Sequence, residues 1–249
     1  MVLSILLFLL CHFLLYGVNS YNRNARDLDE SAPIRGKLRR ISIEESTGTN
    51  YKSWKQKSMK QAFIIAGPNG CGKTILADKL IEEFKLPFIN ADNIALELSQ
   101  GGDVGRVRLQ AGKLFLKKLR DHINENKSFV VETTLAGKYY FPKIIEELKR
   151  KKYKIILIYI SIASAAEAVN KVKQRVKKGG HSVPEEDVVR RFSRSKSNFW
   201  NFYKNRVDLW KIYFSVEENF APVAFGEKNR YNIVDDGLFE SFLDDLGST

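Results

Sequence analysis

The chain has 249 residues, 44% hydrophobic and 28% charged, which suits one large domain or two small ones and excludes a fibre, a peptide hormone and a wholly disordered chain. The 41 lysines and arginines outnumber the 29 acidic residues, and the net charge of +12 favours anionic partners such as nucleotides, nucleic acid or a membrane surface. Two cysteines, Cys11 and Cys71, cannot build a disulfide framework or a cysteine metal site, and His12, His122 and His181 are too scattered to suggest one.

An apolar leader is predicted for residues 1–20. Residues 1–18 carry no charged side chain, and their length lies between the apolar core of a signal peptide and the roughly 20 residues that span a bilayer. The pattern fits a cleaved signal peptide and an uncleaved membrane anchor equally, and a mistaken start codon is a third alternative. Because Arg23 and Arg26 follow the apolar segment, an anchor would leave the bulk of the protein in the cytoplasm, whereas a cleaved leader would export it.

A polar linker is predicted for residues 21–60, because Ser, Thr and Asn patches surround a Pro–Gly break there. Its last part, 51–60, interleaves four lysines with Tyr51 and Trp54. Such a segment could touch a membrane surface or nucleic acid, although short basic segments are more often solvated spacers. Residues 61–249 then form the remaining domain.

From residue 61 onward, short apolar segments alternate with longer segments of helical spacing, which is the pattern of a parallel α/β sheet. Buried strands are predicted at 62–66, 86–89, 128–131 and 155–160, with weaker candidates at 210–214, 221–225 and 231–234. Helices are indicated by the stripe Leu76, Leu80 and Phe84, by the stripe Leu109, Leu116, Leu119 and Ile123, and at 141–150, 164–178 and 185–204. We therefore predict an α/β fold with a central, mainly parallel sheet flanked by helices.

The most specific motif is GPNGCGKT at 67–74, which fits the phosphate-binding loop GxxxxGK followed by Thr, between a buried strand and a helix. Main-chain N–H groups of this loop would cradle the phosphates of ATP, the lysine would meet their outer oxygens, and the threonine hydroxyl would bind Mg²⁺. The residues of the loop are Gly67, Pro68, Asn69, Gly70, Cys71, Gly72, Lys73 and Thr74. The motif makes the predicted fold that of a P-loop NTPase.

Two acidic residues follow predicted strands at the edge of the sheet where ligands of open α/β folds collect. Asp92 comes just after 86–89 and could orient an acceptor hydroxyl and accept its proton late in phosphoryl transfer; alternatively, it caps the next helix. Glu132 ends the strand at 128–131 and could hold Mg²⁺ or a substrate hydroxyl, with Thr134 extending the polar edge. The alternative for Glu132 is another helix cap or a solvated strand end.

The segment at 172–184 joins a basic amphipathic helix to a hinge formed by Gly179 and Gly180. These glycines would let a lid close and bring Arg175 onto the transferring phosphoryl group, where a planar guanidinium stabilises charge. The alternative is a solvated basic face with a glycine C-cap. The next helix carries, on one face, three arginines that could supply a second phosphate contact or only salt bridges: Arg190, Arg191 and Arg194.

These features together resemble the zeta-toxin family of P-loop kinases. The matching segments, in order, are GPNGCGKT, NADNIA at 90–95, LQAGKLFLKKL at 109–119, FVVETTLAG at 129–137 and RVKKGGHSVPEEDVVRRFSRSKSNF at 175–199. The resemblance covers roughly 61–200. It does not cover the leader, the linker or the last fifty residues, and family members of this type have an aromatic residue followed by Asp-Asn-Ser where this chain reads IYFSVEEN at 212–219.

The resemblance implies a kinase that uses ATP and Mg²⁺, whose characterised members phosphorylate a hydroxyl of a UDP-activated amino sugar, typically UDP-N-acetylglucosamine, and are neutralised by an antitoxin. It matches Lys73 to the loop lysine and Thr74 to the magnesium-binding hydroxyl. Arg175 matches the first phosphate-clamping arginine, and Arg191, rather than Arg190, is chosen for the second.

On the acceptor side, the resemblance makes Asp92 the acid that activates the acceptor hydroxyl, and Glu132 and Thr134 contacts to the sugar nucleotide. The function expected is therefore an ATP-dependent kinase acting on a UDP-sugar or a related small hydroxyl substrate. A nucleoside or polynucleotide kinase is one alternative, although nucleic acid is not the expected partner. A non-catalytic nucleotide- or nucleic-acid-binding module is the other.

Overall fold

The computed structural model of the chain describes residues 59–244 and residue 246, apart from residues 101 and 217–218. The predicted leader at 1–20 and nearly all of the predicted linker at 21–60 lie outside the described residues. Within the described part, no helix is long and apolar enough to cross a membrane.

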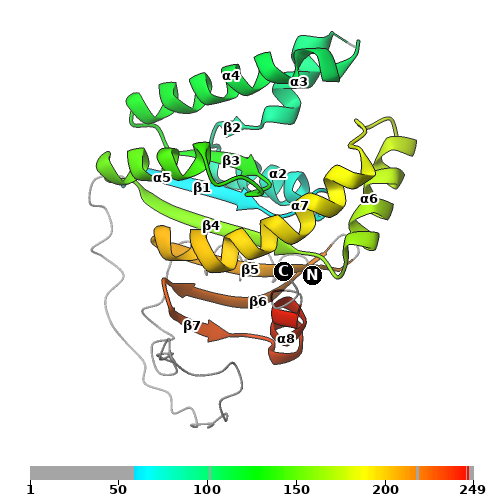
Figure 1. The fold of residues 1–249 in the computed structure, drawn as a ribbon. Helices are drawn as coiled ribbons and strands as arrows, with labels where there is room; N and C mark the ends of the chain where they lie inside the picture. The colour runs from blue at the N-terminus through cyan, green and yellow to red at the C-terminus, as the bar shows by residue number, and fades with distance from the viewer. Residues whose placement is uncertain (1–58, 101, 217–218, 245, 247–249) are drawn as a thin grey trace, which may run out of the picture.

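A seven-stranded sheet forms the centre of the molecule, with strand order β2-β3-β1-β4-β5-β6-β7 (Figure 1). The strands are β1 (Gln61–Ala66), β2 (Phe88–Ile89), β3 (Phe129–Thr133), β4 (Lys154–Ser161), β5 (Leu209–Val216), β6 (Asn219–Glu227) and β7 (Arg230–Ile233). The first five strands pair in parallel, and β6 pairs antiparallel with β5 and β7. The predicted mainly parallel sheet is confirmed, and the three weaker strand candidates are real strands.

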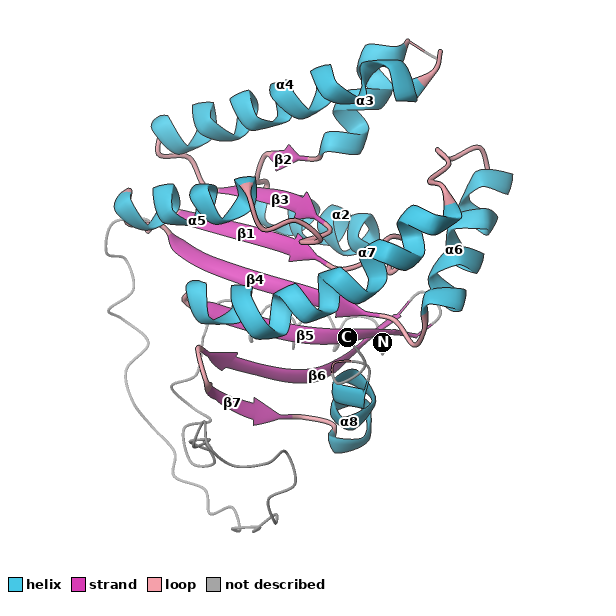
Figure 2. Ribbon diagram, in the orientation of Figure 1, coloured by secondary structure: helices cyan, strands magenta, loops and turns pink. Residues whose placement is uncertain are grey.

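Helices cover both faces of this sheet (Figure 2). They are α2 (Lys73–Phe84), α3 (Ala91–Ser99), α4 (Val104–Asn124), α5 (Tyr140–Arg150), α6 (Ala165–Lys177), α7 (Glu185–Asn198), a π-helix (Phe199–Tyr203), a 3-10 turn (Lys204–Arg206) and α8 (Asp236–Asp244). Helices α2 and α6 bury their apolar faces in one core cluster, whereas α5, the π-helix and α8 contribute to the cluster on the opposite face. The domain boundary at residue 61 stays a prediction.

The central strand β4 shows why its sequence is continuously apolar. Ile155, Leu157 and Tyr159 belong to one core cluster, and Ile156 and Ile158 belong to the other. Because successive side chains of a strand point to opposite faces, a strand with helices on both sides must be apolar at every position. The same alternation occurs in β1, and the phosphate loop follows this strand at the carboxyl edge of the sheet.

The segment after β2 differs from the prediction, because it forms two helices, α3 and α4, where one was expected. Leu109, expected on the buried stripe, is 75% exposed. The first half of α4 packs through Ala111 against α3 in a small separate cluster. The second half of α4 joins the main core, where Leu119 and Ile123 are buried and against which Phe115 and Leu116 pack from partly buried positions. The end of α3 and the start of α4 form a projection beyond the carboxyl edge of the sheet, and α4 then runs back along the β2 side (Figure 1).

An unusual charge lies in the sheet itself. Lys211, on β5, is 2% exposed, and burial, together with the charge of Lys154, lowers the pKa of its ammonium group to about 7. An unfolded lysine keeps its proton up to about pH 10.4, so between about pH 7 and pH 10 the unfolded chain binds more protons than the folded one. The folded state therefore gains stability as the pH rises through this window.

We expect Lys211→Met to raise the free energy of unfolding at pH 7 by about 2 to 4 kcal/mol, because one unit of pKa corresponds to about 1.4 kcal/mol. The gain should shrink toward pH 10, where the wild-type lysine is neutral when folded. Denaturant unfolding at pH 7, 8.5 and 10 measures it, with the exposed Lys117→Met on α4 as control. A gain that does not change with pH would contradict the buried neutral lysine.

Candidate active site

The predicted phosphate loop connects β1 to α2 at the carboxyl edge of the sheet. Gly67 and Gly72 have φ angles of +144° and +91°, and a Cβ on Gly67 would lie 2.4 Å from the carbonyl oxygen of Ile160. The buried Lys73 folds over the loop and donates to the carbonyl oxygen of Pro68 at 2.9 Å. Gly72, the N-cap of α2, has no side chain to accept from the first N–H groups of the helix, which leaves them available to an anion.

Glu132 links the loop to Asn90, the residue that follows β2. Its Oε2 accepts from the hydroxyl of Thr74 at 3.0 Å and from the side-chain amide of Asn90 at 2.8 Å. Its Oε1 lies 3.8 Å from Nζ of Lys73, and both side chains are nearly fully buried. The alternative that Glu132 is a helix cap or a solvated strand end is therefore wrong.

The oxygen atoms of Thr74 and Glu132 fit Mg²⁺ in kind. They are hard donors beside the phosphate loop, and Mg²⁺ is commonly held by one or two protein oxygens together with substrate phosphates and water. Consistent with such a sparse site, the described residues contain no group of three or more His, Cys, Asp and Glu able to hold a metal by themselves. Cys71 is buried, and burial raises the pKa of its thiol, which suits a packing role.

Asp92 does not cap helix α3. Asn90 is the N-cap residue, and its side-chain oxygen accepts from the main-chain N–H groups of Asp92 and Asn93. The carboxylate of Asp92 is thereby free of a capping role and is half-exposed at the first turn of α3. The capping alternative for Asp92 is wrong, and Asn90 is a residue that the sequence analysis missed.

Helix α6 ends in a glycine C-cap, as the alternative for this segment proposed. The N–H of Gly180 donates to the carbonyl of Arg175, the N–H of Gly179 donates to that of Val176, and Gly179 has φ +88°. The side chain of Arg175 is nevertheless not on a solvated face. Its Nη2 donates to the carbonyl oxygen of His181 at 3.0 Å, and its Nε is buried with no hydrogen-bond partner among the described residues.

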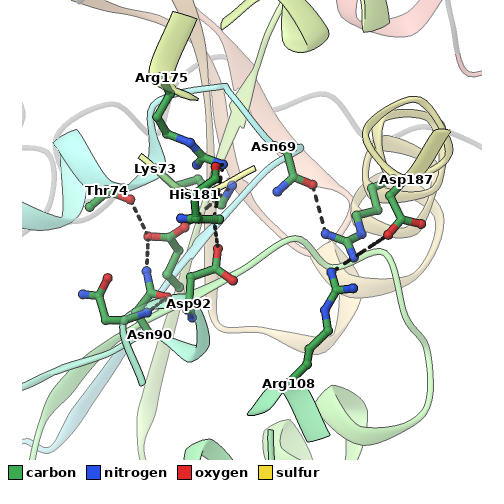
Figure 3. A network of polar contacts seen from close by, with 12 residues as sticks. Asn69, Lys73, Thr74, Asn90, Asp92, Arg108, Arg175, His181 and Asp187 are labelled. Carbon is green, nitrogen blue, oxygen red and sulfur yellow. Dashed lines mark hydrogen bonds and ion pairs between the residues drawn. The ribbon is translucent and has the colours of Figure 1, made fainter. Parts of the chain in front are cut away.

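Basic side chains around Asp92 lower the pKa of its carboxyl group. The Nε2 of His181 lies 3.2 Å from Oδ2 of Asp92 (Figure 3). The pKa of Asp92 lies below its usual value, first because His181 hydrogen-bonds to the carboxylate and also because Lys73 and Arg175 are positively charged nearby, while burial opposes the shift. The carboxylate is therefore ionised at neutral pH.

The two arginines considered for the second phosphate contact have different surroundings. Arg191 donates from Nη1 to Oδ1 of Asn69 in the phosphate loop at 3.3 Å, and its Nη2 lies 3.3 Å from Asp187. Arg190 pairs with Asp187 on its own helix and is 52% exposed, against 22% for Arg191. Asp187 also meets Arg108 of α4 at 3.9 Å, so one carboxylate gathers three arginines. This geometry favours Arg191 over Arg190 as the second arginine that would contact the phosphates.

We expect Arg191→Gln to weaken ATP affinity and phosphoryl transfer by about 10- to 100-fold, because a charge-assisted phosphate contact is lost. Arg190→Gln, the matched neighbour on the same helix, should change both by less than about threefold, as exposed ion pairs contribute little. Calorimetric titration with ATP and a transfer assay measure the two variants. A loss in Arg190→Gln that equals the loss in Arg191→Gln would contradict the assignment.

Some residues of the site could not be placed from sequence. His181 was set aside because the histidines are far apart in the chain, although its position directly after the two glycines was a usable signal. Nothing in the sequence pointed to the contact of Arg108 with Asp187 between α4 and α7. Conversely, the hydroxyl of Thr134 accepts from the N–H of Ala136 in its own loop, so the predicted substrate contact of Thr134 stays a prediction.

Residues 212–216 of the divergent segment end beside the phosphate loop. A Cβ on Gly72 would approach the ring of Phe220 to 3.3 Å and the hydroxyl of Ser215 to 4.0 Å. Lys171 of α6 reaches the same hydroxyl at 3.3 Å. The end of β5 and the start of β6 thus border the loop at Gly72, although the resemblance did not extend to this part of the chain.

Comparison with known proteins gives matches of several kinds. An uncharacterized protein of Haemophilus influenzae is 30% identical over 141 residues, which is 53% of this chain and 92% of that protein. A cytidylate kinase of Saccharolobus islandicus is 34% identical over 83 residues, 30% of this chain and 44% of the kinase. The structure of AvrRxo1-ORF1:-ORF2 with ATP superposes with a TM-score of 0.61 at 19% identity, over 75% of this chain and 64% of that chain. The chain thus spans less than two thirds of the latter two proteins, and the structural match concerns the fold.

The sequence profile of the zeta toxin family matches residues 44–220, which is most of the chain. This match, the phosphate loop and the parallel sheet confirm the predicted P-loop fold and support an ATP-using, kinase-type phosphotransferase. The chain belongs to the zeta toxin family.

Proposed function

We propose that the protein is a kinase that transfers the γ-phosphoryl group of ATP to a hydroxyl of a UDP-activated amino sugar. The observation that carries the proposal is that Asp92, an ionised acid outside the phosphate loop, shares its electrostatic surroundings with Lys73 and Arg175. A protein that only binds a nucleotide needs the loop but not an acid and an arginine that face it together. Membership of the zeta toxin family supports the sugar-nucleotide acceptor.

The residues divide the work of the transfer. The main-chain N–H groups of the loop and Lys73 hold the phosphates of ATP. Thr74 and Glu132 would hold Mg²⁺, which would neutralise phosphate charge when bound. The contact of Glu132 with Thr74 favours this role of Glu132 over a contact to the sugar. As the γ-phosphoryl group passes from the oxygen of ADP to the acceptor oxygen, Asp92 accepts the hydroxyl proton, and an ordinary or low pKa suffices because this proton leaves late.

Two arginines stabilise the charge of the transferring group in this proposal. Arg175 would reach it from the last turn of α6, and Arg191 reaches the loop from α7, where Asp187 holds its guanidinium. Thr134 and the α3–α4 projection border the acceptor. A neutralising antitoxin partner stays a prediction of the family resemblance.

A nucleoside or nucleotide acceptor is the second candidate, and the specific observation that favours it is the similarity to a cytidylate kinase over 83 residues. The match covers less than half of the cytidylate kinase, and for this reason we rank a nucleoside or nucleotide acceptor second.

The experiment incubates the full chain with ATP, Mg²⁺ and a pool of UDP-sugars, nucleosides, nucleotides and short oligonucleotides, and measures the products by mass spectrometry. A phosphate mass increment on a UDP-amino sugar, absent with Asp92→Asn, is the expected result. An increment on a nucleoside or nucleotide alone would select the second candidate. ATP binding without any product would leave only a nucleotide-binding module.

A further inference from the structure

His181 contacts two groups that the proposed function assigns to opposite sides of the reaction. Its imidazole Nε2 lies 3.2 Å from Oδ2 of Asp92, the acceptor-side acid on α3. Its main-chain carbonyl oxygen accepts at 3.0 Å from Nη2 of Arg175, the phosphate-side arginine on α6. Figure 3 shows the three residues converging from three separate segments. One residue therefore touches both groups, through two different atoms.

The hydrogen-bonding capacities of the three groups decide where the imidazole proton lies. The same Nε2 is also 3.2 Å from Nη2 of Arg175. An ionised carboxylate can only accept and a guanidinium can only donate, so Nε2 can bond to one of these neighbours at a time. With a proton on Nε2, His181 donates to Asp92, while Arg175 is satisfied by the carbonyl oxygen. This arrangement leaves both Asp92 and Nη2 of Arg175 with a partner.

The place of His181 in the chain ties this contact to the glycine turn. It follows Gly179 and Gly180, whose N–H groups close the C-terminus of α6. A Cβ on Gly180 would lie 2.6 Å from Cγ of Arg175, so a glycine at this position lets the arginine fold back toward His181. Any movement of the turn therefore moves the contact to Asp92 and the contact to Arg175 together.

We propose that His181 is a positioning residue that holds the carboxylate of Asp92 through Nε2–H while its carbonyl oxygen holds Arg175, so that the acid and the arginine reach the reacting groups together. The inference rests on the proposed function, because it gives His181 a task only if Asp92 serves the acceptor. In this role His181 acts through Asp92 and Arg175. Its task is the orientation and the ionisation of Asp92.

The imidazole is one of several cationic or hydrogen-bonding groups that face Asp92. Lys73 of the loop and Arg175 of α6 act on the carboxylate through their charge, and Arg191 of α7 lies close enough to interact with it electrostatically. The hydrogen bond from His181 is the largest of the influences that lower the pKa of Asp92. Loss of this bond should therefore raise the pKa of Asp92 even though the three charges remain.

The test compares His181→Gln, His181→Asn and His181→Ala in the full chain, with His122→Gln on α4 as a matched control away from the site. The amide nitrogen of glutamine can stand where Nε2 stands, whereas that of asparagine falls short. The carbonyl bond to Arg175 is main-chain and persists in all three. We expect His181→Asn and His181→Ala to lower kcat by about 10- to 100-fold without a change in ATP affinity or Tm. We expect His181→Gln to keep most of the activity.

A second readout needs no acceptor. Carboxyl-labelled aspartate, with the Asp92 signal identified by its loss in Asp92→Asn, reports the pKa of Asp92 by NMR titration. In His181→Asn and His181→Ala we expect the pKa of Asp92 to rise, and the acid limb of the pH profile of kcat to move to higher pH with it. In His181→Gln we expect this pKa to stay low. The proposal would be overturned if the pKa of Asp92 were unchanged in His181→Ala, or if His181→Gln lost as much activity as His181→Ala. An inactive wild type whose Asp92 pKa still depends on His181 would instead count against the proposed function alone.

Discussion

Asp92→Asn abolishes phosphoryl transfer to the acceptor while ATP binding persists, if Asp92 is the acceptor-side acid. The substitution keeps the size of the side chain and removes the oxygen that would accept the hydroxyl proton, so kcat should fall by about 100- to 10,000-fold. The fold should survive, because Asn90 and not Asp92 caps α3. Transfer from radiolabelled ATP measures the rate, and calorimetric titration measures ATP affinity.

The matched control for this prediction is Asp121→Asn, an exposed aspartate near the end of α4. It should transfer phosphate at the wild-type rate. Transfer by Asp92→Asn at a rate near that of the control would remove Asp92 from the chemistry. A loss of ATP binding together with transfer would mean that Asp92 supports the phosphate side of the site rather than the acceptor.

Arg175→Gln should lower kcat by about 1,000-fold and leave ATP affinity nearly unchanged. An arginine that stabilises the equatorial oxygens of the transferring group contributes mostly in the transition state, where a cationic side chain can be worth that factor. Arg175→Lys should recover only a small part of the rate, since an ammonium group lacks the planar pair of donors. Single-turnover rates separate this chemical step from ATP binding.

Lys177→Gln, an exposed basic residue in the last turn of α6, is the control for the loss of positive charge. Its rate should match the wild type. Full recovery by Arg175→Lys would indicate that charge alone matters at this position. Equal losses of ATP affinity and kcat in Arg175→Gln would indicate that the arginine binds ATP in the ground state, as a fixed part of the phosphate site.

Much of the phosphate side was predictable from the sequence because its chemistry is local. The GPNGCGKT motif is eight consecutive residues that run from the end of β1 into the first turn of α2, and apolar periodicity identified both elements. The position of Asp92 directly after β2 was also predictable, because the carboxyl ends of parallel strands meet at one edge of the sheet. The conformation of a phosphate loop depends mainly on consecutive residues, so it could be predicted without knowledge of any long-range contact.

The contacts that join the two sides of the site required the tertiary structure. Glu132 meets Thr74 across 58 positions of sequence, and Arg191 meets Asn69 across 122. The separate α3–α4 cluster, the wall formed by β5 and β6 beside Gly72, and the bridge of His181 between Asp92 and Arg175 are likewise products of packing. The sequence by itself determined the fold class, the phosphate loop and the family. Only the folded chain decided which polar groups become partners, because hydrogen bonds between distant segments depend on distances and directions that residue order does not contain.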